Sequence, residues 1–74
     1  MEAKEQFGLN LRRLRLDACL TQMELSNRSG LDMAEISRLE TGLRDVRLST
    51  IVRLADGLGL PVHTLVDGLG RFSS

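Results

Sequence analysis

The segment from Thr21 to Gly42, TQMELSNRSGLDMAEISRLETG, restricts the fold of this chain more than any other. Thr21 and Asp32 are residues that suit the N-cap of a helix, and each is followed three positions later by a glutamate. Gly30 and Gly42 stand where a left-handed backbone would end the two helices. The spacing therefore predicts two short helices joined by a tight turn, which is the helix-turn-helix arrangement of many DNA readers.

Length and composition restrict the rest of the fold. The chain has 74 residues, which is enough for one small domain, and 42% of them are hydrophobic. Two phenylalanines are its only aromatic residues, so the core must be built mainly from aliphatic side chains. We expect residues 1–74 to form one all-α domain of five helices, with flexible ends at about residues 1–4 and 71–74.

A first helix is predicted over residues 3–18. Its buried stripe is expected to consist of Phe7, Leu11, Leu14 and Ala18. Leu9 and Leu16 lie seven positions apart and therefore share a second face of this helix. We expect this face to pack against the last helix; the alternative is that it remains exposed as a contact for a partner chain.

Two more helices are predicted after the helix-turn-helix segment. One begins at Leu48 or at Ser49, the better cap, and is ended by Gly57 and Gly59. The other begins at Pro61, whose missing N–H is tolerated in a first turn, and stops by residue 68. Their inner faces are expected to contain Ile51, Val52, Leu54, Ala55 and Leu58, and Val62, Leu65, Val66 and Leu69.

Cysteine and histidine content argues against metal and redox chemistry. The single cysteine, Cys19, cannot form an internal disulfide, and with the single histidine, His63, it cannot supply the four ligands of a structural zinc site. Cys19 stands where the first helix should end, a position that favours glycine, and we expect it to be a small buried or half-buried residue. No nucleophile beside a base and no phosphate-binding glycine loop is evident, so we expect no enzyme, cofactor or metal.

Charge and hydropathy set further limits. No apolar run approaches the length of about 18–20 residues that spans a membrane, and the first residues do not resemble a signal peptide. We therefore expect a cytoplasmic protein with no membrane contact and no small-molecule ligand. The formal net charge of zero counts mildly against a nucleic-acid binder, although all of the cationic residues except Lys4 are arginines, which suit phosphate and guanine.

The motif and its flanks, FGLNLRRLR before it and LSTIVRLADGLGLPVHTL after it, resemble the lambda-repressor-like family of helix-turn-helix regulators, also called the XRE or Cro/repressor family. The resemblance covers about residues 7–66. It implies a five-helix transcriptional regulator that binds a palindromic double-stranded DNA operator as a homodimer, with the third helix in the major groove.

The resemblance also implies the residues that bind DNA. They are Thr21, Gln22, Asp32, Met33, Ala34, Glu35, Ser37, Arg38, Arg44 and Arg47. Gln22 would contact a phosphate at a helix N-terminus, and Arg38 would bridge the O6 and N7 atoms of guanine. Glu35 would close a capping box or accept from a cytosine amino group. Met33 and Ala34 stand where the family often has a glutamine, so apolar contact with thymine methyl groups is expected there.

Two further sets of contacts follow from the resemblance. Arg15 and Glu40 match a family pair that joins the first helix to the end of the third, a structural role. The dimer contact is expected on the fifth helix and its flanks. The candidates are Val62, His63, Leu65, Val66, Leu69 and Phe72, with Leu43 and Val46; each apolar residue of the fifth helix can equally belong to the core.

Several functions remain open at this point. The leading one is a small regulator that resembles the controller proteins of restriction–modification systems, with phage repressors and antitoxins as alternatives. A protein-interaction module that has kept the fold without DNA binding is the alternative from another class. Salt separates the two classes, because binding that neutralises several phosphates weakens steeply with salt.

Overall fold

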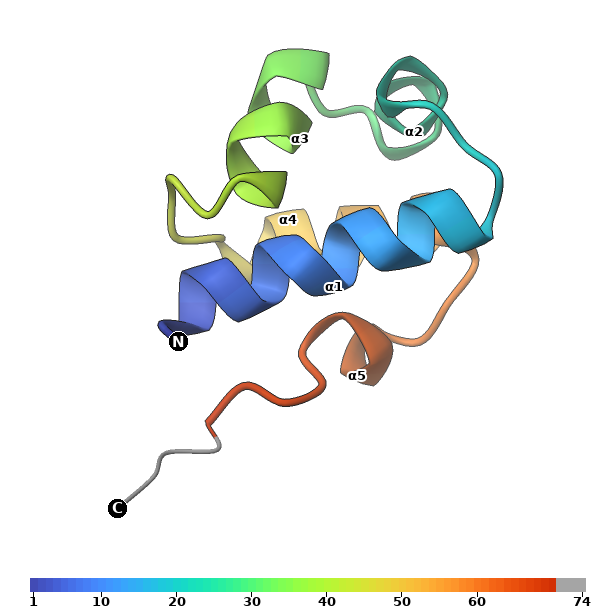
Figure 1. The fold of residues 1–74 in the computed structure, drawn as a ribbon. Coiled ribbons are helices and arrows are strands. Elements are labelled where there is room, and N and C mark those ends of the chain that lie inside the picture. The colour runs from blue at the N-terminus through green and yellow to red at the C-terminus, as the bar shows by residue number, and fades with distance from the viewer. Residues whose placement is uncertain (71–74) are drawn as a thin grey trace.

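The computed structural model describes residues 1–70, and these form five helices and no strand, as the sequence predicts (Figure 1). The helices are α1 (Ala3–Asp17), α2 (Gln22–Ser29), α3 (Met33–Glu40), α4 (Leu48–Leu58) and α5 (Val62–Leu65). In Figure 1, α2 and α3 lie on one side of the long helix α1, α5 lies on the other side and α4 lies behind. The predicted flexible end at residues 71–74 and the predicted contact of Phe72 fall outside the described residues.

The start of α2 has the predicted capping box. The Thr21 hydroxyl accepts a hydrogen bond from the Glu24 N–H at 3.0 Å, and the Glu24 carboxylate accepts one from the Thr21 N–H at 2.8 Å. These bonds lower the pKa of the Glu24 carboxyl group. Gly30 ends α2 at a φ of 77°, also as predicted.

The capping box predicted at Asp32 is absent. Asp32 is the N-cap residue of α3, but its side chain makes no cap hydrogen bond. Asp32, Met33 and Ala34 are all exposed, so water can satisfy the first N–H groups of this helix without a side-chain acceptor.

The last two helices depart from the predicted boundaries. Helix α4 begins at Leu48 with Arg47 as its N-cap residue, so Ser49 is not the cap, and the helix runs through Gly57 to Leu58. A Cβ at Gly57 would lie 3.2 Å from Leu25 Cδ1 and from the Ser29 nitrogen. This glycine therefore allows close packing of α4 on α2 rather than ending a helix. Helix α5 has only four residues and is shorter than predicted.

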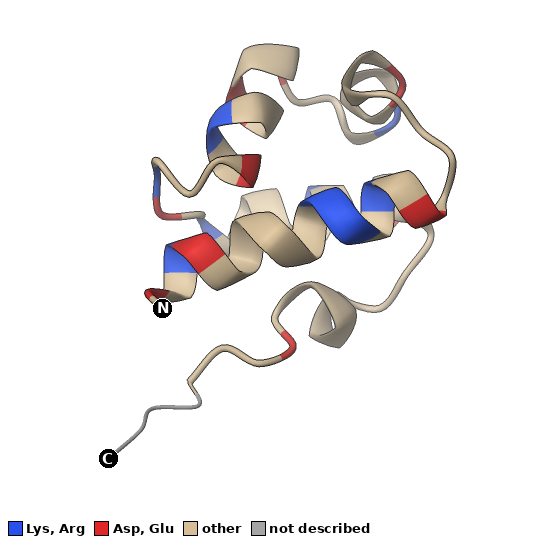
Figure 2. Cartoon of the chain, viewed as in Figure 1, with Lys and Arg blue, Asp and Glu red and all other residues tan. Residues whose placement is uncertain are grey.

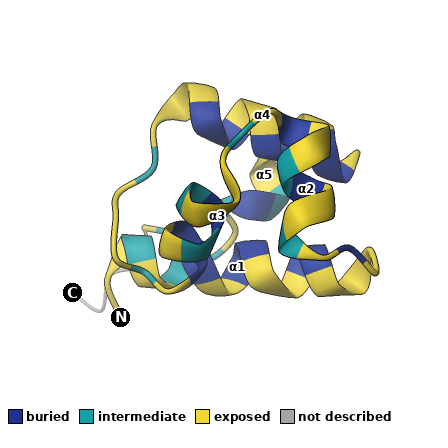
Figure 3. Ribbon diagram, turned by 90° about the horizontal axis from the view of Figure 1, so that it is seen from above, coloured by how far each residue is buried: buried dark blue, intermediate teal, exposed yellow. Residues whose placement is uncertain are grey.

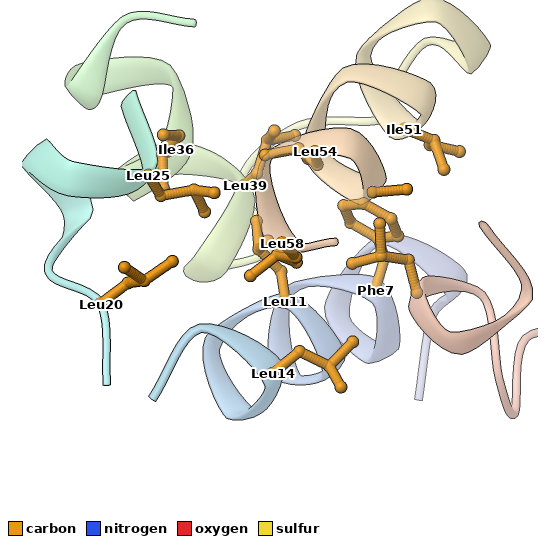
Figure 4. Close-up of a cluster of buried hydrophobic side chains, with 12 residues drawn as sticks. Phe7, Leu11, Leu14, Leu20, Leu25, Ile36, Leu39, Ile51, Leu54 and Leu58 are labelled. Atoms are coloured by element: carbon orange, nitrogen blue, oxygen red, sulfur yellow. The ribbon is translucent and has the colours of Figure 1, made fainter. Parts of the chain in front are cut away.

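An aliphatic core with one phenylalanine joins all five helices (Figure 4). Its buried members are Phe7, Leu11, Leu14, Leu20, Leu25, Ile36, Leu39, Ile51, Leu54, Ala55, Leu58 and Leu65. Three predicted inner residues are wrong: Ala18 lies beyond the end of α1 and is exposed, and Val52 and Val62 are 52% and 40% exposed. Short helices have narrow buried faces, and both apolar side chains lie at their edges, outside the core.

Helices α1 and α3 approach each other closely at Gly8. A Cβ at this position would lie 2.3 Å from the Leu39 carbonyl oxygen and 2.8 Å from the Glu40 carbonyl oxygen. Real Cβ atoms do not come so close to backbone oxygens, so position 8 requires glycine. The last turn of α3 consequently rests directly on the backbone of α1.

Leu9 and Leu16 do not pack against the last helix as predicted, since they are 50% and 52% exposed. The short helix α5 lies instead along the side of α1 that carries Asn10. The Asn10 amide donates hydrogen bonds to the carbonyl oxygens of Leu65 at 2.9 Å and Asp67 at 2.7 Å. These bonds hold the chain after α5 beside α1 and leave the outer face of α1 uncovered (Figure 3).

Candidate nucleic-acid interface

The turn between α2 and α3 is fixed by side-chain hydrogen bonds from α2. The Ser26 hydroxyl donates to the Leu31 carbonyl oxygen at 2.5 Å, and the Leu31 N–H donates to the Ser29 hydroxyl at 3.3 Å. Gly30 supplies the left-handed residue between them. The two helices therefore form a defined unit, with the N-terminus of α2 and one face of α3 exposed on the same side of α1 (Figure 3).

A buried ion pair anchors this unit to α1. Arg15 Nε lies 2.6 Å from Glu40 Oε2 and Arg15 Nη2 lies 3.0 Å from Glu40 Oε1, so the guanidinium meets the carboxylate with two parallel bonds. The side chains are only 9% and 3% exposed. Arg15 Nη1 also donates to the Leu20 carbonyl oxygen at 2.8 Å. The pair predicted from the family resemblance is confirmed, and the Glu40 hydrogen bond raises the pKa of the Arg15 guanidinium further above neutrality.

Gln22 takes part in the same network. Its Nε2 donates to Glu40 Oε1 at 3.1 Å, and the side chain is partly buried at the first position of α2. An amide group has a second N–H and a carbonyl oxygen, so Gln22 keeps hydrogen-bonding capacity for another partner. The sequence predicted a phosphate contact for this residue; the bond to Glu40 was not foreseen, because Gln22 and Glu40 lie 18 positions apart in the chain.

The exposed face of α3 is where the sequence places the reading residues. Ile36 and Leu39 are buried, while Met33, Ala34 and Arg38 are exposed. The other three predicted members also lie on or beside this face: Asp32 is exposed, and Glu35 and Ser37 are partly exposed. Figure 2 shows both acidic and basic positions on this helix, whose charged residues are Glu35, Arg38 and Glu40. Arg38 is the one basic residue of α3, and it is exposed together with the apolar residues Met33 and Ala34.

The loop after α3 adds cationic side chains. Arg44 and Arg47 are exposed, as expected for residues that contact a phosphate backbone. They line one hollow together with Arg53 of α4 and Glu35 of α3. Arg53 was not among the predicted DNA-binding residues; it is exposed one turn into α4, and the hollow brings it near the loop arginines.

A family model described as a helix-turn-helix domain matches residues 6–67. The chain belongs to the helix-turn-helix family. It is 43% identical over 67 residues to the HTH-type transcriptional repressor RghR of Bacillus subtilis, with 89% of this chain and 50% of the repressor covered. The chain thus spans half the length of that repressor. It is 38% identical over 66 residues to an HTH-type transcriptional regulator of Sinorhizobium fredii, with 89% and 86% covered.

Solved structures agree with this assignment of the helix-turn-helix domain. The restriction-modification controller protein C.AhdI of Aeromonas hydrophila matches with a TM-score of 0.81 and 37% identity, covering 84% of this chain and 94% of that one. These matches confirm the resemblance to the lambda-repressor-like regulators. They place this chain among the helix-turn-helix domains of transcriptional regulators, which are not an enzyme family.

The predicted dimer residues of this helix-turn-helix domain have unequal exposure. Val62 and His63 are exposed, and Val66 and Leu69 are partly buried against the core. Leu65 is completely buried, so its expected place in a dimer contact is wrong: with a helix of only four residues, its inward side belongs wholly to the core.

Residues 1–70 contain neither a membrane-spanning helix nor a cluster of metal ligands. No helix there is long and apolar enough to cross a membrane. No group of three or more His, Cys, Asp or Glu side chains in that range could hold a metal ion.

Proposed function

We propose that this helix-turn-helix domain is a sequence-specific transcriptional regulator that binds a palindromic operator as a homodimer, with α3 in the major groove. The observation that carries the proposal is the anchoring of α3. Its last turn rests on Gly8, and its last residue, Glu40, is bound by Arg15 and Gln22. A helix held by these contacts at its C-terminal end presents its N-terminal half and its outer face in a fixed orientation, as base reading requires.

Base contacts are assigned to the exposed residues of α3. The Arg38 guanidinium can bridge the O6 and N7 atoms of a guanine, which makes it the principal polar reader. Met33 and Ala34 offer apolar contact to thymine methyl groups. The remaining residues of this face, Asp32, Glu35 and Ser37, can accept from base amino groups. With few polar readers, DNA shape contributes to the choice of site.

Contacts to the DNA backbone are assigned to α2 and to the loop after α3. Thr21 and Gln22 stand at the N-terminus of α2, where free N–H groups and the helix dipole attract a phosphate. The hydrogen bond that the Gln22 amide donates to Glu40 orients Gln22 toward this role. Arg44 and Arg47 are placed to contact the backbone on the other side of α3, where they position the domain without selecting a sequence.

Homodimer formation is proposed because one module makes few base contacts. Two half-sites one helical turn apart double the number of contacts and impose two-fold symmetry on the operator. Val62, His63, Val66 and Leu69 are the candidates for this contact that retain some exposure. They lie on and after α5.

The test is selection of bound sites from a random duplex DNA pool at low salt, followed by salt titration of the selected site. We expect a palindrome with half-sites about one helical turn apart, and an affinity that falls steeply with salt. A folded, monodisperse protein that enriches no sequence, or binding that hardly responds to salt, would contradict the proposal. Either result would favour a protein-interaction module instead.

A restriction–modification controller is the more specific role that one observation favours. The chain is 37% identical to C.AhdI and covers 94% of it. In such a role operator occupancy, and therefore protein concentration, decides between activation and repression. A reporter placed behind the selected operator should change its output non-monotonically as the protein concentration rises. A simple monotonic repression would favour a phage-type repressor or an antitoxin.

A further inference from the structure

The hollow beside α3 contains an arginine that the proposed DNA contacts do not use. Arg53 is exposed on α4, and together with Arg44 and Arg47 of the loop it lines a hollow of about 520 Å³. A Cβ placed at Gly30 would lie 4.0 Å from Arg53 Nη1, so the guanidinium reaches from α4 toward the turn between α2 and α3. The loop leads from the end of α3 to the start of α4 (Figure 3). The hollow is therefore bounded by α4, by the loop and by the helix-turn-helix unit.

Charge in this hollow is mainly cationic. Besides the three arginines, its charged residues are Glu35 and Asp45. Within residues 1–70, none of these five side chains takes part in an ion pair. The hollow therefore keeps a positive excess, in a chain whose formal net charge is zero. Guanidinium groups that line one hollow without a carboxylate partner suit an anion with several oxygen acceptors, above all a phosphate group.

The hollow lies on one side of the exposed face of α3. Glu35 and Glu40 are five positions apart, which is about 140° around the helix axis. The buried residues Ile36 and Leu39 lie between them. The two glutamates therefore border the exposed face of α3 on its opposite sides, and the hollow is on the side of Glu35.

These two sides of α3 meet different DNA strands in the proposed complex. The major groove is about 12 Å wide, close to the diameter of a helix with its side chains, so a sugar–phosphate backbone passes along each side of α3. Gln22, the proposed phosphate contact of α2, is bound to Glu40 on one side. When Gln22 meets the backbone of one strand, the hollow faces the backbone of the other.

We propose that Arg53 is a further DNA-binding residue, whose guanidinium holds a phosphate of this second backbone in the hollow together with Arg44 and Arg47. The inference rests on the proposed function and adds a contact from α4 to it. A phosphate held between α4 and the loop fixes the position of α3 in the groove without selecting a base.

The first test is the salt dependence of DNA binding by Arg53→Gln, measured from the anisotropy of a labelled duplex. Loss of one phosphate contact should make the slope of log affinity against log salt less steep by about 0.9 for each bound copy of the chain. Because a phosphate contact does not depend on sequence, binding to the selected operator and to random duplex should weaken by the same factor. Arg53→Lys keeps the charge and should retain most of the native slope.

The second test locates the phosphate. Each phosphate of the selected half-site is replaced in turn by an uncharged methylphosphonate. We expect one position at which the replacement weakens binding by the native chain much more than binding by Arg53→Gln, because the variant has already lost its contact there. This position should lie on the strand opposite to the one on which Gln22→Ala gives the same result.

Arg12→Gln is the matched control. It makes the same charge change outside the hollow, on the outer face of α1 one turn from the exposed Leu9 and Leu16. Its salt slope should equal that of the native chain, which would separate a local contact of Arg53 from an effect of net charge. Both arginines are exposed and take part in no ion pair within residues 1–70, so both variants should keep the fold, as thermal unfolding would check.

Two results would overturn the inference. One is a salt slope of Arg53→Gln equal to that of the native chain, and the other is the same set of sensitive phosphates for both proteins. If the native chain nevertheless selects a palindrome, the proposed function stands and only the contact of Arg53 is lost. A native chain that binds random duplex but enriches no sequence would contradict the proposed function, and the slope on random duplex would still decide the contact of Arg53. A native chain that binds no duplex would contradict both.

Discussion

Removal of one partner of the buried ion pair between Arg15 and Glu40 should destabilise the fold more than most single substitutions can. In Glu40→Leu, the guanidinium of Arg15 keeps only its bond to the Leu20 carbonyl oxygen, in a site where its side chain is 9% exposed. In Arg15→Met, the carboxylate of Glu40 keeps only the bond from Gln22. Either change leaves a charge without its counter-ion in a buried site.

The expected loss is about 3–5 kcal/mol in the free energy of unfolding for each single variant. In a domain of this size, 1 kcal/mol corresponds to a shift of about 4–8 °C in Tm, so the Tm should fall by at least about 12 °C. The double variant Arg15→Met with Glu40→Leu removes both charges together. It leaves the Leu20 carbonyl without its donor and the partly exposed Gln22 amide without its acceptor, but no charge, and should therefore recover most of the loss.

Urea unfolding at pH 7, followed by circular dichroism, measures all four proteins, and the double-mutant cycle gives the coupling energy. Single losses of less than about 1 kcal/mol, typical of exposed pairs, would refute the argument.

Five further substitutions, each of a single residue, give testable outcomes. Gly8→Ala should lower the free energy of unfolding by about 1–3 kcal/mol, because the added Cβ would lie 2.3 Å from the Leu39 carbonyl oxygen. Alanine is otherwise the better helix former, so an unchanged urea midpoint would contradict the close approach. Cys19→Gly should stabilise the fold by up to about 1 kcal/mol in the same assay, since Cys19 is exposed at a φ of 58°, and a loss of stability would argue against strain. The folded chain lowers the pKa of Glu24, so its ionised carboxylate stabilises the fold above pH 4.5, and this stabilisation is lost as the pH falls through the lowered pKa. The stability advantage of the native chain over Glu24→Gln should therefore disappear in acid. A stability difference that stays constant with pH would exclude the cap as its source. In DNA binding, Arg38→Ala should cost about 1–3 kcal/mol at one base position only, while Gln22→Ala should weaken binding to selected and random DNA equally, as competition titrations would show.

Local features of the sequence predicted the parts of the fold that depend on a few neighbouring residues. The capping box of Thr21 and Glu24 and the left-handed glycine at 30 involve contacts within four positions, and both are present. The pair of Arg15 and Glu40 spans 25 positions, and it was predictable only through resemblance to a family.

The wrong predictions concern residues whose environment is set by elements distant in sequence. Gly57 reads as a helix stop, yet it lies inside α4 because α2 packs directly against it. Leu65 reads equally well as core or as interface, and the shortness of α5 decides for the core. Leu9 and Leu16 remain exposed because the amide of Asn10 holds the chain after α5 along another side of α1. No local pattern carries this information.

The exposed position of Cys19 makes the native sequence suitable for site-specific spectroscopy. It is the only thiol in the chain, and it lies three positions before Gln22, at the end of α2 that is proposed to meet a phosphate. A maleimide fluorophore would therefore attach at one known place without mutagenesis. Its anisotropy would report the size of the assembly, and quenching of its emission would report the approach of DNA.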